Sequence, residues 1–134
     1  MSKSHHIDLL VHIEDTDYSG VVHHPNYLHY LERGRVAFFK ALGFGISEQA
    51  KTGQFYVIRH IDITYLQPAR LENSLRVVTE VSALSGAQIT FSQRVERLSP
   101  DPCPLANATV FVVSVNEHMK PTRLQTTLRE RLHA

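Results

Sequence analysis

The densest group of residues able to do chemistry lies near the N-terminus, in the stretch EDTDYSGVVHHPNYL that runs from residue 14 to residue 28. It holds two aspartates two positions apart, Asp15 and Asp17, followed by the neighbouring histidines His23 and His24. Pro25 suits the first turn of a helix. A helix N-terminus offers free N–H groups and the positive end of its dipole, which favour a developing oxyanion. The pattern therefore predicts a carboxylate beside an electrophile-binding site.

The same residues raise the alternative of a metal site. Asp15 and Asp17 as a metal-binding pair would need further oxygen ligands arranged around them. The chain has nine histidines, but no His-Glu-x-x-His pattern or other standard zinc spacing. Cys103 is the only cysteine, so neither an intrachain disulfide nor a thiolate zinc site is available. We therefore predict no metal and no cofactor.

The elements that position these residues follow from hydrophobic periodicity. Alternation of apolar and polar residues with period two, typical of half-buried strands, recurs along the chain. The segments are 5–14, 55–65, 75–83, 87–96 and 106–117. The last of them is apolar on both faces, which predicts a central strand or one covered by a partner subunit. Residues 124–132 suit a short closing helix.

One long helix of about 17 residues is expected to begin at Pro25. Its apolar stripe consists of Tyr27, Leu31, Gly34, Phe38 and Ala41, and the stripe excludes Glu32, Arg35 and Lys40. Gly43 followed by Phe44 predicts a left-handed C-terminal cap. A sheet of the predicted width would wrap around this helix, and one face of the sheet would pack against the stripe.

Composition limits the class of protein. The chain has 134 residues, of which 43% are hydrophobic and 20% charged, as expected for one ordinary domain with a packed core. With 14 Lys and Arg against 13 Asp and Glu, no basic patch for nucleic acid is expected. Uninterrupted apolar runs reach only four residues, so no membrane span is expected and a cytoplasmic location is predicted.

Residues 15–27, DTDYSGVVHHPNY, resemble the active-site motif of hotdog-fold thioesterases of the 4-hydroxybenzoyl-CoA thioesterase and YbgC type. The resemblance continues through LERGR at 31–35 and ITYLQPA at 63–69. It implies an α+β hotdog fold, in which a long antiparallel sheet wraps around a central helix. It also implies that residues 1–134 form one such domain.

The resemblance implies a role for each matching catalytic position. Asp17 corresponds to the catalytic carboxylate, which either attacks the thioester carbonyl or activates water as a general base. The alternative from the residues alone is that Asp17 is a plain capping or turn residue. The backbone amide of His24 corresponds to the group that polarises the thioester oxygen. Gly20 would let the loop turn tightly and approach the substrate.

Further matching positions are expected to bind substrate. Asn26 and Tyr27 would complete the helix start, and His23 replaces an aromatic residue common in relatives and would line the acyl pocket. Glu32 would either position water in the pocket or form an exposed pair with Arg35. Two roles are open for His24. It either orients Asp17 or the substrate, or it packs at the start of the helix.

The function implied is hydrolysis of an acyl-CoA thioester to a free acid and CoA, with CoA entering only as part of the substrate. His24 matches the YbgC branch of the family, whereas Pro25 matches the 4-hydroxybenzoyl branch. The expected acyl group is therefore small or medium in size, and aromatic acyl groups are included. The family places its cleft between subunits, which implies a homodimer or homotetramer. The alternatives are an acyl-carrier-protein thioesterase and a non-catalytic acyl-CoA binding module.

Three predictions concern residues outside this motif. Tyr65 lies on an apolar strand face and is expected in the core, with a place beside Tyr18 in the lining of the acyl site as the alternative. Asn73 replaces an aspartate common in relatives and is expected to alter a turn. The basic residues near the C-terminus, among them Arg129 and Arg131, are expected on a solvated surface, with contact to CoA phosphates as the alternative.

Overall fold

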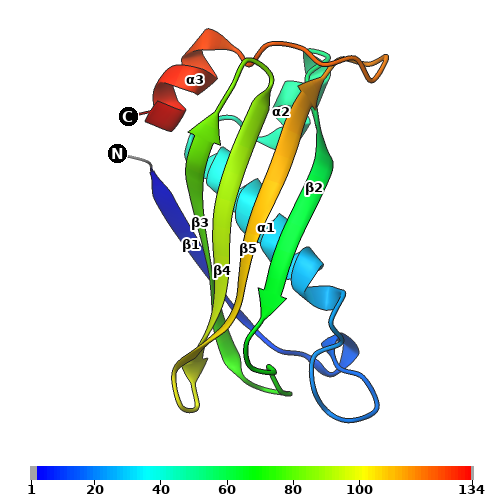
Figure 1. Ribbon diagram of the computed structural model, residues 1–134, viewed down its shortest axis with the longest axis vertical. Coiled ribbons are helices and arrows are strands. Elements are labelled where there is room, and N and C mark those ends of the chain that lie inside the picture. Colours follow the sequence, from blue (N-terminus) through cyan, green and yellow to red (C-terminus); the bar gives the residue numbers. More distant parts are fainter. Residues whose placement is uncertain (1–2, 134) are drawn as a thin grey trace.

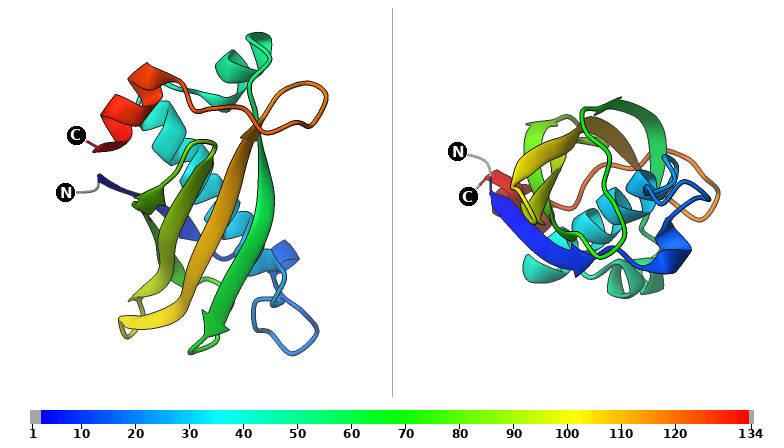
Figure 2. Two further views of the ribbon diagram at one scale, coloured as in Figure 1. Left: turned by 45° about the horizontal axis from the view of Figure 1, so that its top comes forward. Right: turned by 90° about the horizontal axis from the view of Figure 1, so that it is seen from below.

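A five-stranded antiparallel sheet curls around one long helix in the computed structural model, which describes residues 3–133 (Figure 1). The strand order is β1-β3-β4-β5-β2, so β1 and β2 are the edges and β5 is an inner strand, as its two apolar faces predicted. The strands are β1 Ser4–Leu10, β2 Phe55–Tyr65, β3 Ser74–Leu84, β4 Gln88–Ser99 and β5 Cys103–Val115. The helices are α1 Asn26–Ala41, α2 Ile46–Lys51 and α3 Thr126–His133, with one 3-10 turn at Ile13–Asp15. Figure 2 shows the sheet wrapping around α1, which confirms the expected α+β arrangement.

The core lies between α1 and the concave face of the sheet. Tyr27, Leu31 and Phe38 are buried, as the apolar stripe predicted. Two positions of the helix differ from the prediction. Ala41 is exposed in the last turn, although the next residue, Leu42, is buried. Arg35 is buried at 7% exposure, although its charge argued for the opposite face.

Gly34 lets α1 approach the sheet closely. A Cβ atom at this position would lie 2.8 Å from the Thr79 hydroxyl oxygen and 2.8 Å from a Val77 methyl group on β3. Real Cβ atoms do not come this close to their neighbours, so any larger residue must displace the helix or these two side chains. The backbone of α1 therefore sits nearer to β3 than an alanine would allow.

The ends of α1 are formed as its sequence predicted. Pro25 has a φ of −65° at the position that precedes the first helical residue. Gly43 has a φ of +85°, and the Phe44 N–H donates to the carbonyl of Phe39, so the chain leaves the helix through a left-handed cap. Arg131 of α3 donates to the carbonyl of Leu42 and so also satisfies the C-terminus of α1.

Two local elements differ from the sequence prediction. The first strand ends at Leu10 rather than at residue 14, because the chain turns through the 3-10 segment Ile13–Asp15 instead of continuing its alternation. The short helix α2 was not predicted, and it is six residues long with only Gln49 buried. Too few apolar residues lie on one face of α2 to give a periodic signal.

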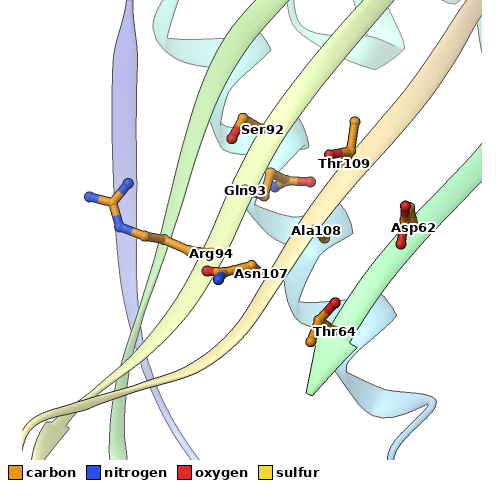
Figure 3. A pocket seen from close by; sticks show the side chains of 8 residues that line it. All are labelled: Asp62, Thr64, Ser92, Gln93, Arg94, Asn107, Ala108 and Thr109. Atoms are coloured by element: carbon orange, nitrogen blue, oxygen red, sulfur yellow. The ribbon is translucent and has the colours of Figure 1, made fainter. Parts of the chain in front are cut away.

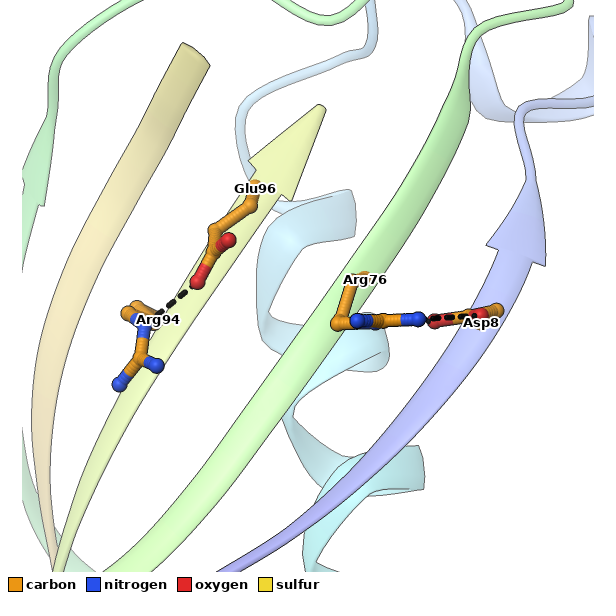
Figure 4. A network of polar contacts seen from close by, with 4 residues as sticks. All are labelled: Asp8, Arg76, Arg94 and Glu96. Carbon is orange, nitrogen blue, oxygen red and sulfur yellow. Dashed lines mark hydrogen bonds and ion pairs between the residues drawn. The ribbon is translucent and has the colours of Figure 1, made fainter. Parts of the chain in front are cut away.

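The convex face of the sheet is polar. Arg76 of β3 makes a two-point ion pair with Asp8 of β1, and Arg94 of β4 pairs with Glu96 on the same strand (Figure 4). A shallow cavity of about 260 Å³ lies over β2, β4 and β5, where Asp62, Asn107 and their neighbours meet (Figure 3). No residue that the sequence singled out for catalysis or binding lines this face. Within residues 3–133, no helix is both long and apolar enough to cross a membrane.

Candidate active site

The loop between β1 and α1 is pinned at several points along its length. Thr16 and Val22 form an isolated antiparallel bridge, so the segment between them is a closed turn. Val21 bridges to Arg70, which ties the turn to the connection between β2 and β3. Gly20 has a φ of +87° and open space around it, so the tight turn expected at this residue is confirmed.

Asp15 anchors the base of this loop from inside the protein. Its side chain is buried at 8% exposure and accepts hydrogen bonds from the His12 N–H and from the Asn26 side-chain amide, both at 2.9 Å. Burial raises the pKa of the Asp15 carboxyl, but these donors outweigh it, so the pKa lies below its ordinary value. Asp15 is therefore an ionised structural group that holds the start of α1 against the 3-10 turn.

Asp17 stands in the open part of the loop. Its Oδ1 accepts two hydrogen bonds from Ser19, one from the hydroxyl at 2.6 Å and one from the N–H at 2.8 Å. The Ser19 hydroxyl is the largest cause that lowers the pKa of the Asp17 carboxyl below its ordinary value. Asp17 is thus an ionised, solvent-accessible carboxylate whose second oxygen has no hydrogen-bond partner among residues 3–133.

The start of α1 presents a free amide. The N–H groups of Asn26 and Tyr27 donate to the carbonyls of His23 and His24. No hydrogen bond from the described residues occupies the N–H of His24 itself. From the other side, the Tyr65 hydroxyl donates to the His24 carbonyl at 3.0 Å. The peptide between His23 and His24 is therefore held through its carbonyl by Asn26 while its N–H stays available, and Tyr65 holds the next peptide along the chain.

Two neighbouring cavities surround this entrance. The first, of about 370 Å³, brings together Asp17, His23 and Asn26, with His29 and Asp15 also on its wall. The second, of about 310 Å³, is lined by His24, Tyr27 and Tyr65, together with Val22 and the segment 66–68. His23 lines the first cavity and His24 the second, and the centres of their rings are 5.1 Å apart. Of the seven residues assigned to the site from the sequence, five line these cavities.

The remaining two residues assigned from the sequence lie elsewhere. Gly20 shapes the loop but lines neither cavity. Glu32 faces a third cavity of about 240 Å³, between α1 and β2, which it shares with Arg35. The expected exposed pair of Glu32 and Arg35 is wrong, since Arg35 is buried and the described residues show no ion pair between the two.

At the site, Ser19 was not predicted from the sequence, and Tyr65 takes the alternative position rather than the expected one. Ser19 was treated only as part of the loop, although serine two positions after an aspartate is a common source of such local hydrogen bonds. Tyr65 was expected in the core but is 44% exposed at the end of β2, packed edge-on against Tyr27. The position of Tyr65 depends on tertiary contact with α1, for which the strand pattern holds no signal.

Other predictions concern groups near the site. Asn73 accepts a hydrogen bond from the Arg70 N–H within the turn before β3, so its expected role in a turn is confirmed. Arg129 and Arg131 donate to backbone carbonyls of the β3–β4 turn and of Leu42. These two side chains are therefore structural anchors of α3. Within residues 3–133, no group of three or more His, Cys, Asp or Glu is arranged to hold a metal ion.

Comparison with known proteins agrees with this geometry. The family model of the thioesterase superfamily matches residues 19–103. The acyl-CoA thioesterase YbgC of Haemophilus influenzae is 37% identical over 125 residues, which cover 92% of this chain and 90% of that protein. The crystal structure of a probable thioesterase from Bartonella henselae superposes with a TM-score of 0.86 at 35% identity, covering 92% of this chain and all of that one.

A more distant structure shares the fold alone. The 4-hydroxybenzoyl-CoA thioesterase of Pseudomonas sp. strain CBS-3 superposes with a TM-score of 0.90 at 18% identity, over 97% of this chain and 99% of that one. Together with the sheet wrapped around α1, these matches establish both fold and family. The chain therefore belongs to the thioesterase superfamily and is a thioester hydrolase with the hotdog fold.

Proposed function

We propose that the protein hydrolyses acyl-CoA thioesters at the entrance of α1. The observation that carries this proposal is the pairing of an ionised, accessible carboxylate at Asp17 with the unoccupied N–H of His24. A thioester carbonyl bound here would place its oxygen on the His24 N–H, which stabilises the negative charge that develops in the transition state. The acyl carbon would then face Asp17 across the cavity that Asp17 shares with His23 and Asn26.

Asp17 can act in two ways from this position. As a nucleophile it attacks the acyl carbon and forms a mixed anhydride while the CoA thiolate leaves, and water then hydrolyses the anhydride. As a general base it takes a proton from water, which attacks the same carbon and releases the same thiolate. Both routes need an ionised Asp17, and neither requires a cofactor. Turnover is accordingly expected to survive exhaustive treatment with a chelator.

A second copy of the chain is expected to complete the cleft. The edge strand β2 has no partner on its outer side within the described residues, and apolar side chains are exposed along it and on the adjoining face of α1. They are Val36, Phe55, Ile58, Tyr65 and Leu66. Two copies related by a two-fold axis would pair these edges antiparallel. We therefore propose a homodimer through β2, alone or within a homotetramer.

The deciding experiment measures thiol release from short, long and aromatic acyl-CoA esters by the wild type and by Asp17→Asn. The amide keeps the size of the side chain but loses its charge, so kcat is expected to collapse. Asp62→Asn removes an exposed carboxylate from the convex face and serves as the control, with turnover unchanged. Full activity of Asp17→Asn, at the same unfolding temperature and oligomeric state, would overturn the assignment.

The same assay separates the alternative functions. An acyl-carrier-protein thioesterase would reach saturation with acyl carrier protein at lower concentration than with the CoA ester of the same acyl group. A binding module would take up acyl-CoA without releasing thiol from any ester. Cell fractionation tests the proposed cytoplasmic location, and sedimentation of the purified full chain tests the proposed dimer or tetramer.

A further inference from the structure

Arg35 is a buried cation that forms no ion pair with the described residues. Its side chain is 93% buried between α1 and the sheet, and burial lowers the pKa of its guanidinium. No carboxylate of residues 3–133 lies within 4.0 Å of it. An isolated buried charge is costly unless it is paired and hydrogen-bonded. The nitrogens of Arg35 are not among the fully buried unpartnered atoms of the described residues, so an anionic partner could reach this guanidinium and would stabilise it.

The guanidinium is held rigidly by a polar network. One terminal nitrogen of Arg35 donates to the Gln93 side-chain oxygen at 3.0 Å. The Gln93 amide nitrogen in turn donates to the Leu31 carbonyl and to the Thr79 hydroxyl, both at 2.9 Å. These bonds fix the amide of Gln93 so that its oxygen faces Arg35. The remaining N–H groups of Arg35 have no partner among the described residues.

Arg35 lines the cavity of about 240 Å³ between α1 and β2. The rest of the wall is largely apolar and includes Phe39, Ile58 and Val112. The Tyr56 hydroxyl, also on the wall, is already bonded to the Gln49 side chain. The available donors in this cavity therefore belong to Arg35, and a planar guanidinium matches a carboxylate through two parallel hydrogen bonds.

Glu32 is the one acidic residue on the same wall. Its charge acts on Arg35 from beyond ion-pair distance, and its side chain is exposed, so water screens it. A carboxylate deep in the cavity would interact more strongly with the buried guanidinium than with this solvated neighbour. Glu32 would nevertheless oppose such a ligand, and this opposition gives the proposal a test of its own.

We propose that the Arg35 cavity binds the far end of the acyl group and selects acyl thioesters that carry a carboxylate there. The proposal rests on the thioesterase function and names its substrate class. Within one chain, His24 and Arg35 are eleven positions apart, about 16 Å along a helix axis. In an antiparallel pairing of β2 edges, the Tyr65 end of one copy would approach the Phe55 end of the other. The cavity of one copy would then serve the catalytic entrance of its partner.

The experiment compares mono-CoA esters of dicarboxylic acids with four to twelve carbons against simple acyl-CoA esters of equal length. The measured quantity is the ratio of kcat/KM between the two members of each pair. The wild type is expected to prefer the carboxylated member about tenfold or more at its best length, as charged hydrogen bonds in a desolvated site allow. A ratio near one at every length would overturn the proposal.

Three variants test whether Arg35 causes the preference for carboxylated esters. Arg35→Met removes the cation and should bring the ratio close to one, whereas Glu32→Gln removes the opposing charge and should raise the ratio. Lys40→Met removes an exposed positive charge from the same helix and should leave the ratio unchanged. If Arg35→Met does not fold, Glu32→Gln decides, because a carboxylate beside Arg35 must gain from the loss of a neighbouring negative charge. An unchanged ratio in Glu32→Gln then overturns the proposal.

Binding of thioether analogues, which cannot be hydrolysed, separates this inference from the proposed function. Absence of turnover on every ester would count against the thioesterase function alone. Tighter binding of carboxylated thioethers that depends on Arg35 would still support the cavity assignment. Equal binding of both analogues would instead indicate that Arg35 pairs with a carboxylate from a second copy of the chain, and would overturn it.

Discussion

The hydroxyl of Tyr65 donates a hydrogen bond to the carbonyl of His24 at 3.0 Å, across 41 positions of sequence. This bond ties the last residue of the edge strand β2 to the peptide at the entrance of α1. The Tyr65 ring also packs edge-on against Tyr27, with ring centres 5.2 Å apart. The residue that carries the proposed electrophile-binding amide is therefore held, through the peptide that follows this amide, by the strand through which we expect a second copy to pair.

Tyr65→Phe should lower kcat while the protein stays folded. The variant keeps the ring and loses one hydrogen bond at an exposed position, so we expect a two- to tenfold fall in kcat with KM little changed. Tyr18→Phe is the matched control, because Tyr18 is fully exposed and its hydroxyl has no hydrogen-bond partner among the described residues. Equal kcat values for the two variants would show that the bond to His24 does not position the amide.

Ser19→Ala should shift the acid limb of the pH–activity profile to higher pH. The Ser19 hydroxyl lowers the pKa of the Asp17 carboxyl, so its removal returns that pKa toward the ordinary value of about 3.9. Activity that needs an ionised Asp17 is retained above its pKa and lost as the pH falls through it. The variant should therefore lose kcat/KM at a higher pH than the wild type does.

Ser19→Thr is the control for this prediction, because threonine keeps the hydroxyl and should keep the low acid limb. The measurement is kcat/KM across the acid range, with folding monitored at each pH. If kcat/KM falls at the same pH in Ser19→Ala and in the wild type, the ionisation of Asp17 does not set the acid limb.

Asp15→Asn should destabilise the protein by about 1–3 kcal/mol at neutral pH. The two carboxylate oxygens of Asp15 accept one hydrogen bond from the His12 N–H and one from the Asn26 side-chain amide. In Asp15→Asn, one of these oxygens becomes an NH₂ group, which would face one of these two N–H donors and could not accept its hydrogen bond. Chemical unfolding of both proteins measures the difference. Asp8→Asn, which breaks an exposed ion pair with Arg76, should cost less.

The pH dependence of this difference follows from the pKa of Asp15. Because that pKa lies below its value in the unfolded chain, the stabilisation is fully present above the unfolded value of about 3.9. It is lost as the pH falls through the lower folded value. The gap between the wild type and Asp15→Asn should therefore close in acid, and a gap that stays constant there would contradict an ionised Asp15.

Much of the fold was predictable because its signals are local. Strand alternation gave β2 its observed bounds of 55–65, and Gly43 with Phe44 marked the end of α1. The 3-10 turn that ends at Asp15 was missed because its one apolar residue, Ile13, continues the alternation of β1. The loop itself was recognisable from its dense polar residues and its resemblance to known thioesterases.

What the sequence could not predict depends on tertiary contacts. A helical pattern assigns a charged residue to the solvent face, but Arg35 is buried because Gln93 on β4 supplies an acceptor there. The separation of Glu32 from Asp17 into different cavities likewise follows from the path of β2 past α1. Neither relationship has a counterpart in the spacing of residues along the chain.

Gly34→Ala should destabilise the protein although alanine is the better helix former. Helix propensity alone would favour alanine by about 1 kcal/mol. The new methyl group would meet Thr79 and Val77 at 2.8 Å, and overpacking of this kind costs about 1–3 kcal/mol. Both neighbours lie on the buried face of β3, so neither can move into solvent. We therefore expect a net loss of stability, measured by chemical unfolding.

The pair Arg33→Ala and Arg33→Gly supplies the comparison for Gly34→Ala. Arg33 is exposed on the same helix, so the difference between its two variants measures helix propensity without a packing contribution. Alanine should be the more stable of the two at position 33 and the less stable at position 34. A gain in stability for Gly34→Ala would mean that α1 can move away from β3 at little cost. The buried network of Arg35 and Gln93 would then be less rigid than its hydrogen bonds indicate.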